Sequence, residues 1–284
     1  MNQAGTVLIV GADGMIGRTL ADRFAAAGRT VVRTTLLPTA GAISLDLARE
    51  AAAWTPPPAS IAFLCAAITS QEQCRSRRAE SRAVNVEGTM ALAERLARQG
   101  THVVFPSTNL VFDGLRPRQS PHAPYAPQTE YGRQKAETEA RLRQLPGTCV
   151  VRFTKVLGRA APLLLGWIAA LRRGEVIRPF SDMPMAPVPL DFAAETLVAV
   201  AARRVEGVVQ VSAEKDITYA EAARFVADFV GCPPELIQPV TVAESGAAIE
   251  YVPAHTTLDT ARLERELGLV PPPLWTAIAL GMES

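Results

Sequence analysis

Short apolar runs alternate with longer amphipathic stretches through the first half of the chain. Runs rich in valine, isoleucine and other apolar residues predict β-strands at residues 6–10, 30–36, 61–65, 102–106 and 149–153. The stretches between them predict helices at residues 16–27, 47–54, 78–98 and 131–144. The strand runs are continuously apolar, which is typical of a parallel sheet that helices cover on both faces. The pattern therefore predicts an α/β fold with a doubly wound parallel sheet, a Rossmann fold.

The rhythm changes after residue 153, where prolines become frequent and the predicted elements shorten. The pattern there predicts a helix near residues 193–203, a strand near 208–211 and a helix near 220–230. We expect residues 1–155 to form a dinucleotide-binding domain and residues 156–284 a smaller α/β substrate-binding region, with about 186–204 returning to the first domain. The proline-rich stretches 56–58 and 117–127 predict rigid surface loops, and the second could border a substrate cleft.

Composition narrows the class of protein. The chain has 284 residues, 48% of them hydrophobic, and a formal net charge of +1, which favours neither disorder nor a nucleic-acid-binding surface. Its longest apolar stretch, at residues 161–171, is too short to span a membrane. The amino terminus has no signal-peptide pattern, so we expect a cytoplasmic protein without a membrane partner. The cysteines (Cys65, Cys74, Cys149 and Cys232) are irregularly spaced, so we expect reduced thiols and no metal site.

A glycine-rich turn follows the first predicted strand, with the sequence GADGMIG at residues 11–17. Gly11 would permit the tight turn, Gly14 would let backbone N–H groups approach a pyrophosphate, and Gly17 would let the helix pack closely on the sheet. The positive end of the helix dipole would then face the phosphates. The spacing is G-x-x-G-x-x-G, not the commoner G-x-G-x-x-G, and glycines alone would also suit a structural turn. The strand before and the helix after favour a dinucleotide cofactor.

The end of the second predicted strand bears on the choice of cofactor. An acidic residue there would bind the adenosine ribose and favour NAD, but residues 32–36 contain no carboxylate. Arg33 could meet the 2′-phosphate of NADP with help from Arg18, or both arginines could simply be solvated. We therefore prefer NADP over NAD. Asp46 and Leu47 are candidates for a contact with the adenine.

Tyr131 and Lys135 lie four residues apart, on one face of a predicted helix. An ammonium near a phenol favours the phenolate and lowers the phenol's pKa, so Tyr131 could exchange a proton with a carbonyl or an alcohol at neutral pH. The same spacing is common on ordinary surface helices. Its significance here comes from the glycine-rich turn and from the pair Ser107 and Thr108, which precede it along the chain.

The chain resembles the extended short-chain dehydrogenase/reductase family, at residues 11–17, 85–89, 106–114 and 131–135. Within that family it is most similar to the dTDP-4-dehydrorhamnose reductase branch, and the resemblance extends over nearly the whole chain. It departs from the branch at Asn109 and Leu110, where Asp-Tyr is usual, and at Val252, where an arginine commonly precedes the proline. The resemblance therefore implies the reaction type without implying which sugar is bound.

The resemblance implies that the protein is an NAD(P)-dependent oxidoreductase that reduces a keto group of a nucleotide-linked sugar. Tyr131 would donate the proton, Lys135 would bind the nicotinamide ribose, and Thr108 would hold the substrate oxygen. Asn85 would hold the backbone of its helix and contribute to the proton relay. The expected cofactor-binding residues are Gly11, Asp13, Gly14, Met15, Ile16, Gly17, Arg18, Arg33, Asp46, Leu47, Ala66, Ala67, Tyr131 and Lys135. The expected substrate-binding residues are Thr69, Ser107, Thr108, Asn109 and Phe112.

Two other functions use the same motifs. A sugar-nucleotide epimerase or dehydratase would retain NAD and use the same tyrosine to oxidise its substrate first. A non-catalytic, NADP-binding regulatory subunit would keep the fold without the reaction. Fold alone does not separate these classes. A homodimer is compatible with each of them.

Overall fold

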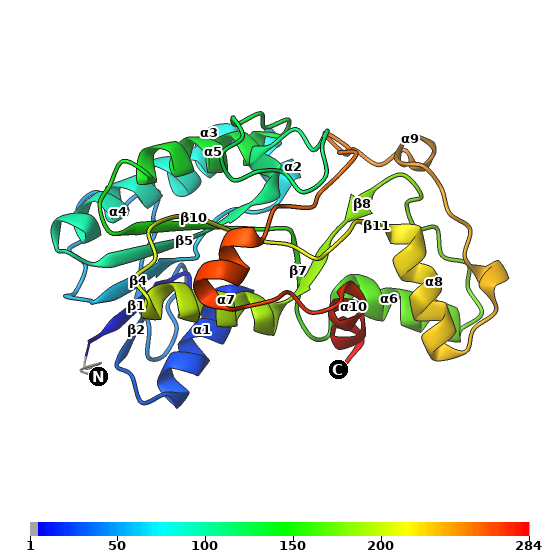
Figure 1. The fold of residues 1–284 in the computed structure, drawn as a ribbon, viewed down its shortest axis with the longest axis horizontal. Coiled ribbons are helices and arrows are strands. Elements are labelled where there is room, and N and C mark those ends of the chain that lie inside the picture. The colour runs from blue at the N-terminus through cyan, green and yellow to red at the C-terminus, as the bar shows by residue number, and fades with distance from the viewer. Residues whose placement is uncertain (1–4, 284) are drawn as a thin grey trace.

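The computed structural model describes residues 5–283. Its centre is a seven-stranded sheet in the order β10-β6-β5-β4-β1-β2-β3, in which every neighbouring pair is parallel (Figure 1). The strands are β1 (Val7–Val10), β2 (Val31–Thr35), β3 (Ile43–Ser44), β4 (Ile61–Leu64), β5 (His102–Thr108), β6 (Thr148–Phe153) and β10 (Gly207–Val211). The predicted doubly wound parallel sheet is confirmed.

Helices cover both faces of this sheet. They are α1 (Met15–Ala26), α7 (Leu190–Ala202), α4 (Thr89–Arg98) and α5 (Glu130–Leu142). Val7 and Ile9 of β1 pack in one core with α1 and α7, whereas Leu8 and Val10 pack in a second core with α4 and α5. Successive side chains of a strand point to opposite faces, so most positions of a strand with helices on both sides are apolar. This explains why the strand runs are continuously apolar.

One predicted helix is wrong and another is interrupted. Residues 47–53 form single turns instead of the helix expected at 47–54, with Asp46 accepting hydrogen bonds from Ala48 N–H through its side chain and from Glu50 N–H through its carbonyl. The chain there makes successive turns without the regular hydrogen-bond ladder of a helix. The stretch expected at 78–98 is helical throughout, but α3 (Arg78–Arg82) passes into a π-helical turn, η1 (Ala83–Gly88), before α4 begins.

The second half of the chain builds a separate hydrophobic core beside the sheet (Figure 1). Its helices are α6 (Pro162–Arg172), α8 (Tyr219–Val230) and α10 (Leu274–Met282). Two small sheets accompany them, β7 (Lys155–Leu157) with β9 (Pro187–Pro189) and β8 (Pro184–Met185) with β11 (Ile217–Thr218). The strand expected near 208–211 does not belong to this region, because β10 pairs with β6 at the edge of the main sheet. The division of the chain at residue 155 stays a prediction.

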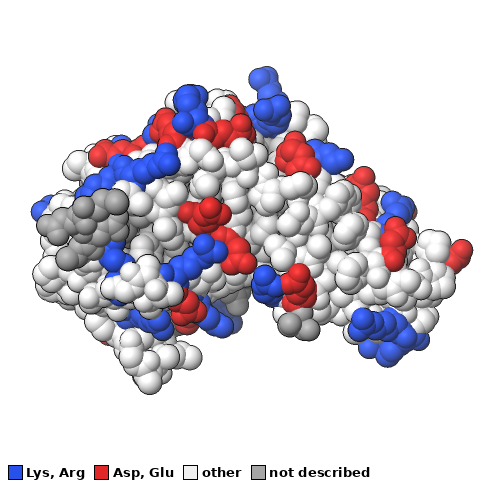
Figure 2. Space-filling model, turned by 60° about the horizontal axis from the view of Figure 1, so that its bottom comes forward, with Lys and Arg blue, Asp and Glu red and all other residues white. Residues whose placement is uncertain are grey.

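The surface carries mixed charge. On the face shown in Figure 2, basic and acidic side chains are interspersed instead of gathering into a field of one sign. Such a surface does not attract a polyanion strongly. Within residues 5–283, no helix combines the length and the apolar character needed to cross a membrane.

A buried ion pair joins the sheet to α5. Arg152 of β6 and Glu139 of α5 are both 0% exposed, and the Arg152 Nη2 lies 2.7 Å from the Glu139 Oε2. The guanidinium also donates to the Gln210 side chain on β10 and lies 4.8 Å from the centre of the Phe112 ring. Because every charged group here has partners, the pair fixes β6, β10, α5 and the loop after β5 relative to one another.

We expect Glu139→Gln to destabilise the fold strongly, because it leaves the buried Arg152 guanidinium without a counter-charge. The free energy of unfolding should fall by about 3–5 kcal/mol, as measured by urea denaturation. Glu175→Gln is the control, since Glu175 pairs with Arg173 in full contact with solvent and should change stability little. Equal effects of the two substitutions would contradict the structural role of the buried pair.

Candidate active site

The glycines of the glycine-rich turn have two different roles, packing within the protein and leaving space for a ligand. Gly11 has a φ of +82°, and a Cβ there would lie 2.6 Å from the backbone nitrogen of Ala66. A Cβ at Gly17 would collide with the Gly11 carbonyl, so both positions require glycine for the protein's own packing. A Cβ at Gly14 would meet only the Gly11 oxygen, at 3.5 Å. The space beside Gly14 at the start of α1 therefore fits the close approach of a phosphate group.

A cleft of about 500 Å³ opens beside this turn, at the carboxyl ends of β1, β2 and β4. In an open parallel sheet, ligands bind at this edge, where the order of the strands reverses. The expected cofactor residues that line the cleft are Gly11, Asp13, Gly14, Asp46, Leu47, Ala66 and Ala67. Arg49, Glu80 and Ile68 also line it, although the sequence interpretation missed them. The only available signal for Arg49 was its position three residues after Asp46.

The remaining expected cofactor residues lie outside this cleft. Arg33 points toward α1, where its Nη2 lies 3.5 Å from the Asp22 carboxylate. Arg18 donates to the Asp13 carbonyl and so braces the turn itself. Met15, Ile16 and Gly17 belong to the first turns of α1, and Met15 lines a neighbouring cavity with Lys155. The arginine that the structure brings to the cleft is thus Arg49, whose side chain is 86% exposed.

The first turns of α5 are fastened to the end of β5. The Lys135 ammonium donates a 2.7 Å hydrogen bond to the Pro106 carbonyl of β5. A Cβ at Gly132 would collide with the Leu110 carbonyl, so only glycine permits this contact. These contacts involve residues that follow Tyr131 along α5 and residues on either side of Thr108 along the other segment. The structure therefore places the start of α5, which carries Tyr131 and Lys135, against the end of β5, where Thr108 lies. Their joint role in catalysis stays a prediction.

Ser107 and Thr108 are the last two residues of β5, and their hydroxyls differ in hydrogen bonding. The Thr108 hydroxyl accepts from Leu110 N–H at 3.2 Å and so caps the short helix η2 (Asn109–Val111). The buried Ser107 hydroxyl has no hydrogen-bond partner among residues 5–283. A buried polar group without a partner is costly, and the expected contact of Ser107 with the substrate stays a prediction.

Three further expected site residues have distinct surroundings. Asn85 exchanges two hydrogen bonds with the backbone of Ile68, at 2.8 and 2.9 Å, and also donates to Gln134 of α5. It thereby holds the loop that forms one wall of the cofactor cleft. Thr69 lines a separate cleft of about 300 Å³. Phe112 is buried under the Arg152 guanidinium, and its ring serves the core there.

The expected lowering of the Tyr131 pKa is not observed. Burial raises the pKa of the Tyr131 phenol, and the Cys74 side chain adds to this shift. Lys135 does not counter it, because its ammonium is directed to the Pro106 carbonyl and lies 3.9 Å from the centre of the Phe105 ring. Burial also lowers the pKa of Lys135 to about 8, against the opposing charge of Glu139. Tyr131 is therefore a protonated phenol at neutral pH, the form that a proton donor requires.

These features define the class of protein, an extended short-chain dehydrogenase/reductase. The model of the family described as RmlD substrate binding domain matches residues 5–283. A dTDP-4-dehydrorhamnose reductase of Mycobacterium tuberculosis is 30% identical over 251 residues, which are 84% of this chain and 80% of that protein. The chain belongs to this RmlD family, the family of the dTDP-4-dehydrorhamnose reductases. It is accordingly an NAD(P)-dependent oxidoreductase.

Solved structures share the whole fold. The dTDP-4-dehydrorhamnose reductase of Bacillus anthracis in complex with NADP has a TM-score of 0.86 and 20% identity, and the match covers 98% of this chain and 99% of that one. MoeE5 in complex with UDP-glucose and NAD has a TM-score of 0.81 and 22% identity, covering 98% and 97%. At these identities, the likeness establishes the fold.

We expect Gly14→Ala to separate cofactor binding from stability. The added methyl group has room in the protein and the backbone there is extended, so the melting temperature should stay nearly unchanged. The methyl group would occupy the space for the pyrophosphate and weaken NADPH binding by about tenfold or more, about 1.4 kcal/mol. Titration calorimetry measures the affinity. Gly17→Ala should instead lower the melting temperature; unchanged NADPH affinity in Gly14→Ala would count against this cofactor site.

The burial of Lys135 predicts a pH dependence of stability. Its pKa is lower in the folded protein than in the unfolded chain, so the folded state binds fewer protons above about pH 8. The free energy of unfolding contributed by this group therefore rises with pH from about 8 to the usual lysine pKa. Lys135→Met removes this rise. Urea denaturation gives the free energy of unfolding of the variant minus that of wild type, and this difference should be about 2 kcal/mol larger at pH 7 than at pH 10. The same difference at both pH values would contradict the prediction.

Proposed function

We propose that the protein uses NAD(P)H to reduce a keto group of a nucleotide-linked sugar, with Tyr131 as the proton donor. One observation supports this most directly: the contacts of Gly132 with Leu110 and of Lys135 with Pro106 fasten the start of α5, which carries Tyr131, to the residues on either side of Thr108. This group lies next to the end of β5, in the same row of strand ends that borders the cofactor cleft. A carbonyl placed there would meet a proton donor and hydroxyl groups together.

Each residue has a defined task in this reaction. The cofactor, when bound, supplies the hydride that reaches the carbonyl carbon. The Tyr131 phenol, kept protonated by burial, donates its proton to the carbonyl oxygen and so completes the alcohol. Thr108 and Ser107 hydrogen-bond that oxygen and orient it. The Lys135 ammonium, with a pKa of about 8, remains charged at neutral pH and would bind the nicotinamide ribose from its place at the Pro106 carbonyl.

The cofactor and the substrate can be specified further. We favour NADP over NAD, since β2 ends without a carboxylate and Arg49 faces the cleft where a 2′-phosphate could be bound. The names of the relatives favour a nucleotide-linked sugar as substrate. Asn109 and Leu110 stand beside Thr108 where the family usually has a carboxylate and a phenol, so the sugar itself stays open. A cytoplasmic location and a homodimer stay predictions.

A screen of nucleotide-linked keto sugars, run with NADPH and with NADH, tests the function. Wild type should consume NADPH faster than NADH with at least one substrate. Tyr131→Phe should lower kcat by about 100-fold or more, with NADPH affinity unchanged because the ring still fills its place.

The rival functions give different results in the same screen. Tightly retained NAD in the purified protein, with isomerised or dehydrated product, would indicate an epimerase or dehydratase. If no sugar is reduced, or if Tyr131→Phe matches wild type, the reductase proposal fails. Stable binding of a partner enzyme in that case would favour a regulatory subunit.

A further inference from the structure

A segment of the second half of the chain returns to the elements that carry the proposed site. We call residues 250–255 the strap; it follows the short helix α9 (Val242–Ser245) and crosses toward α5 and the loop after β5 (Figure 1). The sequence analysis assigns no site residue to the strap, and Val252 lacks the charge that the family often has there. Its contacts with the main domain are nevertheless specific.

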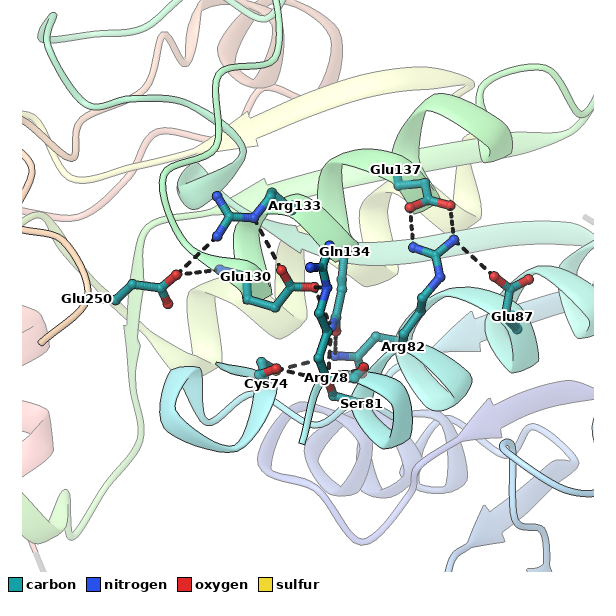
Figure 3. A network of polar contacts seen from close by, with 11 residues as sticks. Cys74, Arg78, Ser81, Arg82, Glu87, Glu130, Arg133, Gln134, Glu137 and Glu250 are labelled. Carbon is teal, nitrogen blue, oxygen red and sulfur yellow. Dashed lines mark hydrogen bonds and ion pairs between the residues drawn. The ribbon is translucent and has the colours of Figure 1, made fainter. Parts of the chain in front are cut away.

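Glu250 binds the first turn of α5. Its Oε1 accepts a hydrogen bond from Glu130 N–H at 3.0 Å and another from the Arg133 guanidinium at 3.2 Å (Figure 3). Glu130 and Arg133 flank Tyr131 in this turn. The carboxylate also lies at the positive end of the α5 dipole, where a negative charge is stabilising. Its Oε2 is buried without a hydrogen-bond partner among residues 5–283, so the attachment depends on one oxygen.

The turn that Glu250 holds is itself fixed from the other side. Glu130 is buried and is paired with Arg78 of α3, at 3.0 Å, and with Arg133, at 3.2 Å (Figure 3). Gln134 donates to the same Glu130 carboxylate at 3.1 Å. The side chain of Glu130 is thus held by the main domain, whereas its backbone N–H is held by the strap. Glu250 completes a polar network around the backbone of Tyr131.

The rest of the strap is attached to the loop that follows Thr108. The Tyr251 hydroxyl donates to the Asp113 carbonyl at 2.8 Å, and His255 N–H donates to the Gly114 carbonyl at 2.8 Å. Gly114 has a φ of +67°, and a Cβ there would collide with Pro253, so the strap packs directly on this loop. The strap therefore contacts both segments of the proposed site, the one that carries Thr108 and the one that carries Tyr131.

The strap also forms a wall of the second cleft. This cleft, of about 300 Å³, lies between the two halves of the chain, with Thr69 and Arg75 on one side and Ile249, Glu250 and Tyr251 on the other. Glu250, which holds the first turn of α5, is thus itself part of the wall of this cleft.

We propose that Glu250 is a positioning residue, which holds the first turn of α5 so that Tyr131 is placed to reach the substrate carbonyl. The proposal rests on the proposed function for its kinetic consequence. The Glu250 carboxylate takes no proton and touches no reacting atom. It acts through the Glu130 N–H, and small displacements of a reacting group are known to reduce rates by large factors.

Three substitutions of Glu250 separate this role from others. Glu250→Ala removes the acceptor, and Glu250→Asp shortens the side chain by one methylene so that it no longer reaches Glu130 N–H. Both should lower kcat by about tenfold or more, with NADPH affinity unchanged, because the cofactor cleft is elsewhere. Glu250→Gln keeps an oxygen at the Oε1 position and should retain most of the wild-type kcat. The substrate is the keto sugar found in the screen.

Glu244→Ala is the matched control. Glu244 is also a carboxylate at a helix N-terminus, accepting from Thr241 N–H at 2.8 Å at the start of α9, but it belongs to a capping box without contact to α5. Its removal should leave kcat at the wild-type value. A loss of kcat in Glu244→Ala equal to that in Glu250→Ala would overturn the proposal, as would a loss in Glu250→Gln as large as in Glu250→Ala.

Hydrogen exchange gives a test that needs no substrate. In Glu250→Ala, the Glu130 amide should exchange at least about fivefold faster than in wild type, whereas amides of α4 should not change. Unchanged exchange at Glu130 would overturn the proposal whether or not a keto sugar is reduced. Faster exchange with unchanged kcat in all three Glu250 variants would also overturn it, leaving only a structural contact. If wild type turns over no keto sugar, the proposed function fails. The exchange rate of the Glu130 amide then still tests whether Glu250 holds the first turn of α5.

Discussion

The contact between the Lys135 ammonium and the Pro106 carbonyl is the interaction on which the proposed site depends. It joins α5 to β5 and sets the distance between the tyrosine on one and the hydroxyls at the end of the other. Holding an ammonium in the interior is unfavourable, as its lowered pKa shows. The Glu139 carboxylate, one turn further along α5, reduces that cost and is itself neutralised by Arg152. Lys135, Glu139 and Arg152 thus form a row of alternating charges from the site into the core.

The parallel sheet places the cofactor cleft and the proposed proton-delivery group along the same edge. All strands of the sheet run in the same direction, so the turns after β1, β2 and β4 and the end of β5 open on the same side. The first group forms the cofactor cleft, and β5 with α5 forms the proton-delivery group. Asn85 connects them, because its side chain binds the cleft loop at Ile68 and the α5 residue Gln134 together.

Burial gives Tyr131 and Lys135 complementary states. Desolvation disfavours the charged form of each group, so it raises the pKa of the phenol and lowers the pKa of the ammonium. A reductase needs a tyrosine that holds its proton until the alkoxide forms, whereas an enzyme that first oxidises its substrate needs a phenolate. The direction of the Tyr131 shift is the one that a proton donor requires.

The sequence by itself determined the parallel fold, the glycine-rich turn and the Tyr131–Lys135 pair. These depend on local patterns: apolar runs, the φ of Gly11, the close packing of Gly17 and a spacing of one helical turn. Side-chain direction and long-range contact were decided only by the tertiary structure. Arg33 lies on the side of β2 that faces α1, so the arginine at the cleft is Arg49, and residues 47–53 form turns instead of the expected helix. Glu250 approaches Glu130 across 120 residues of sequence, and only packing of the two halves could bring it there.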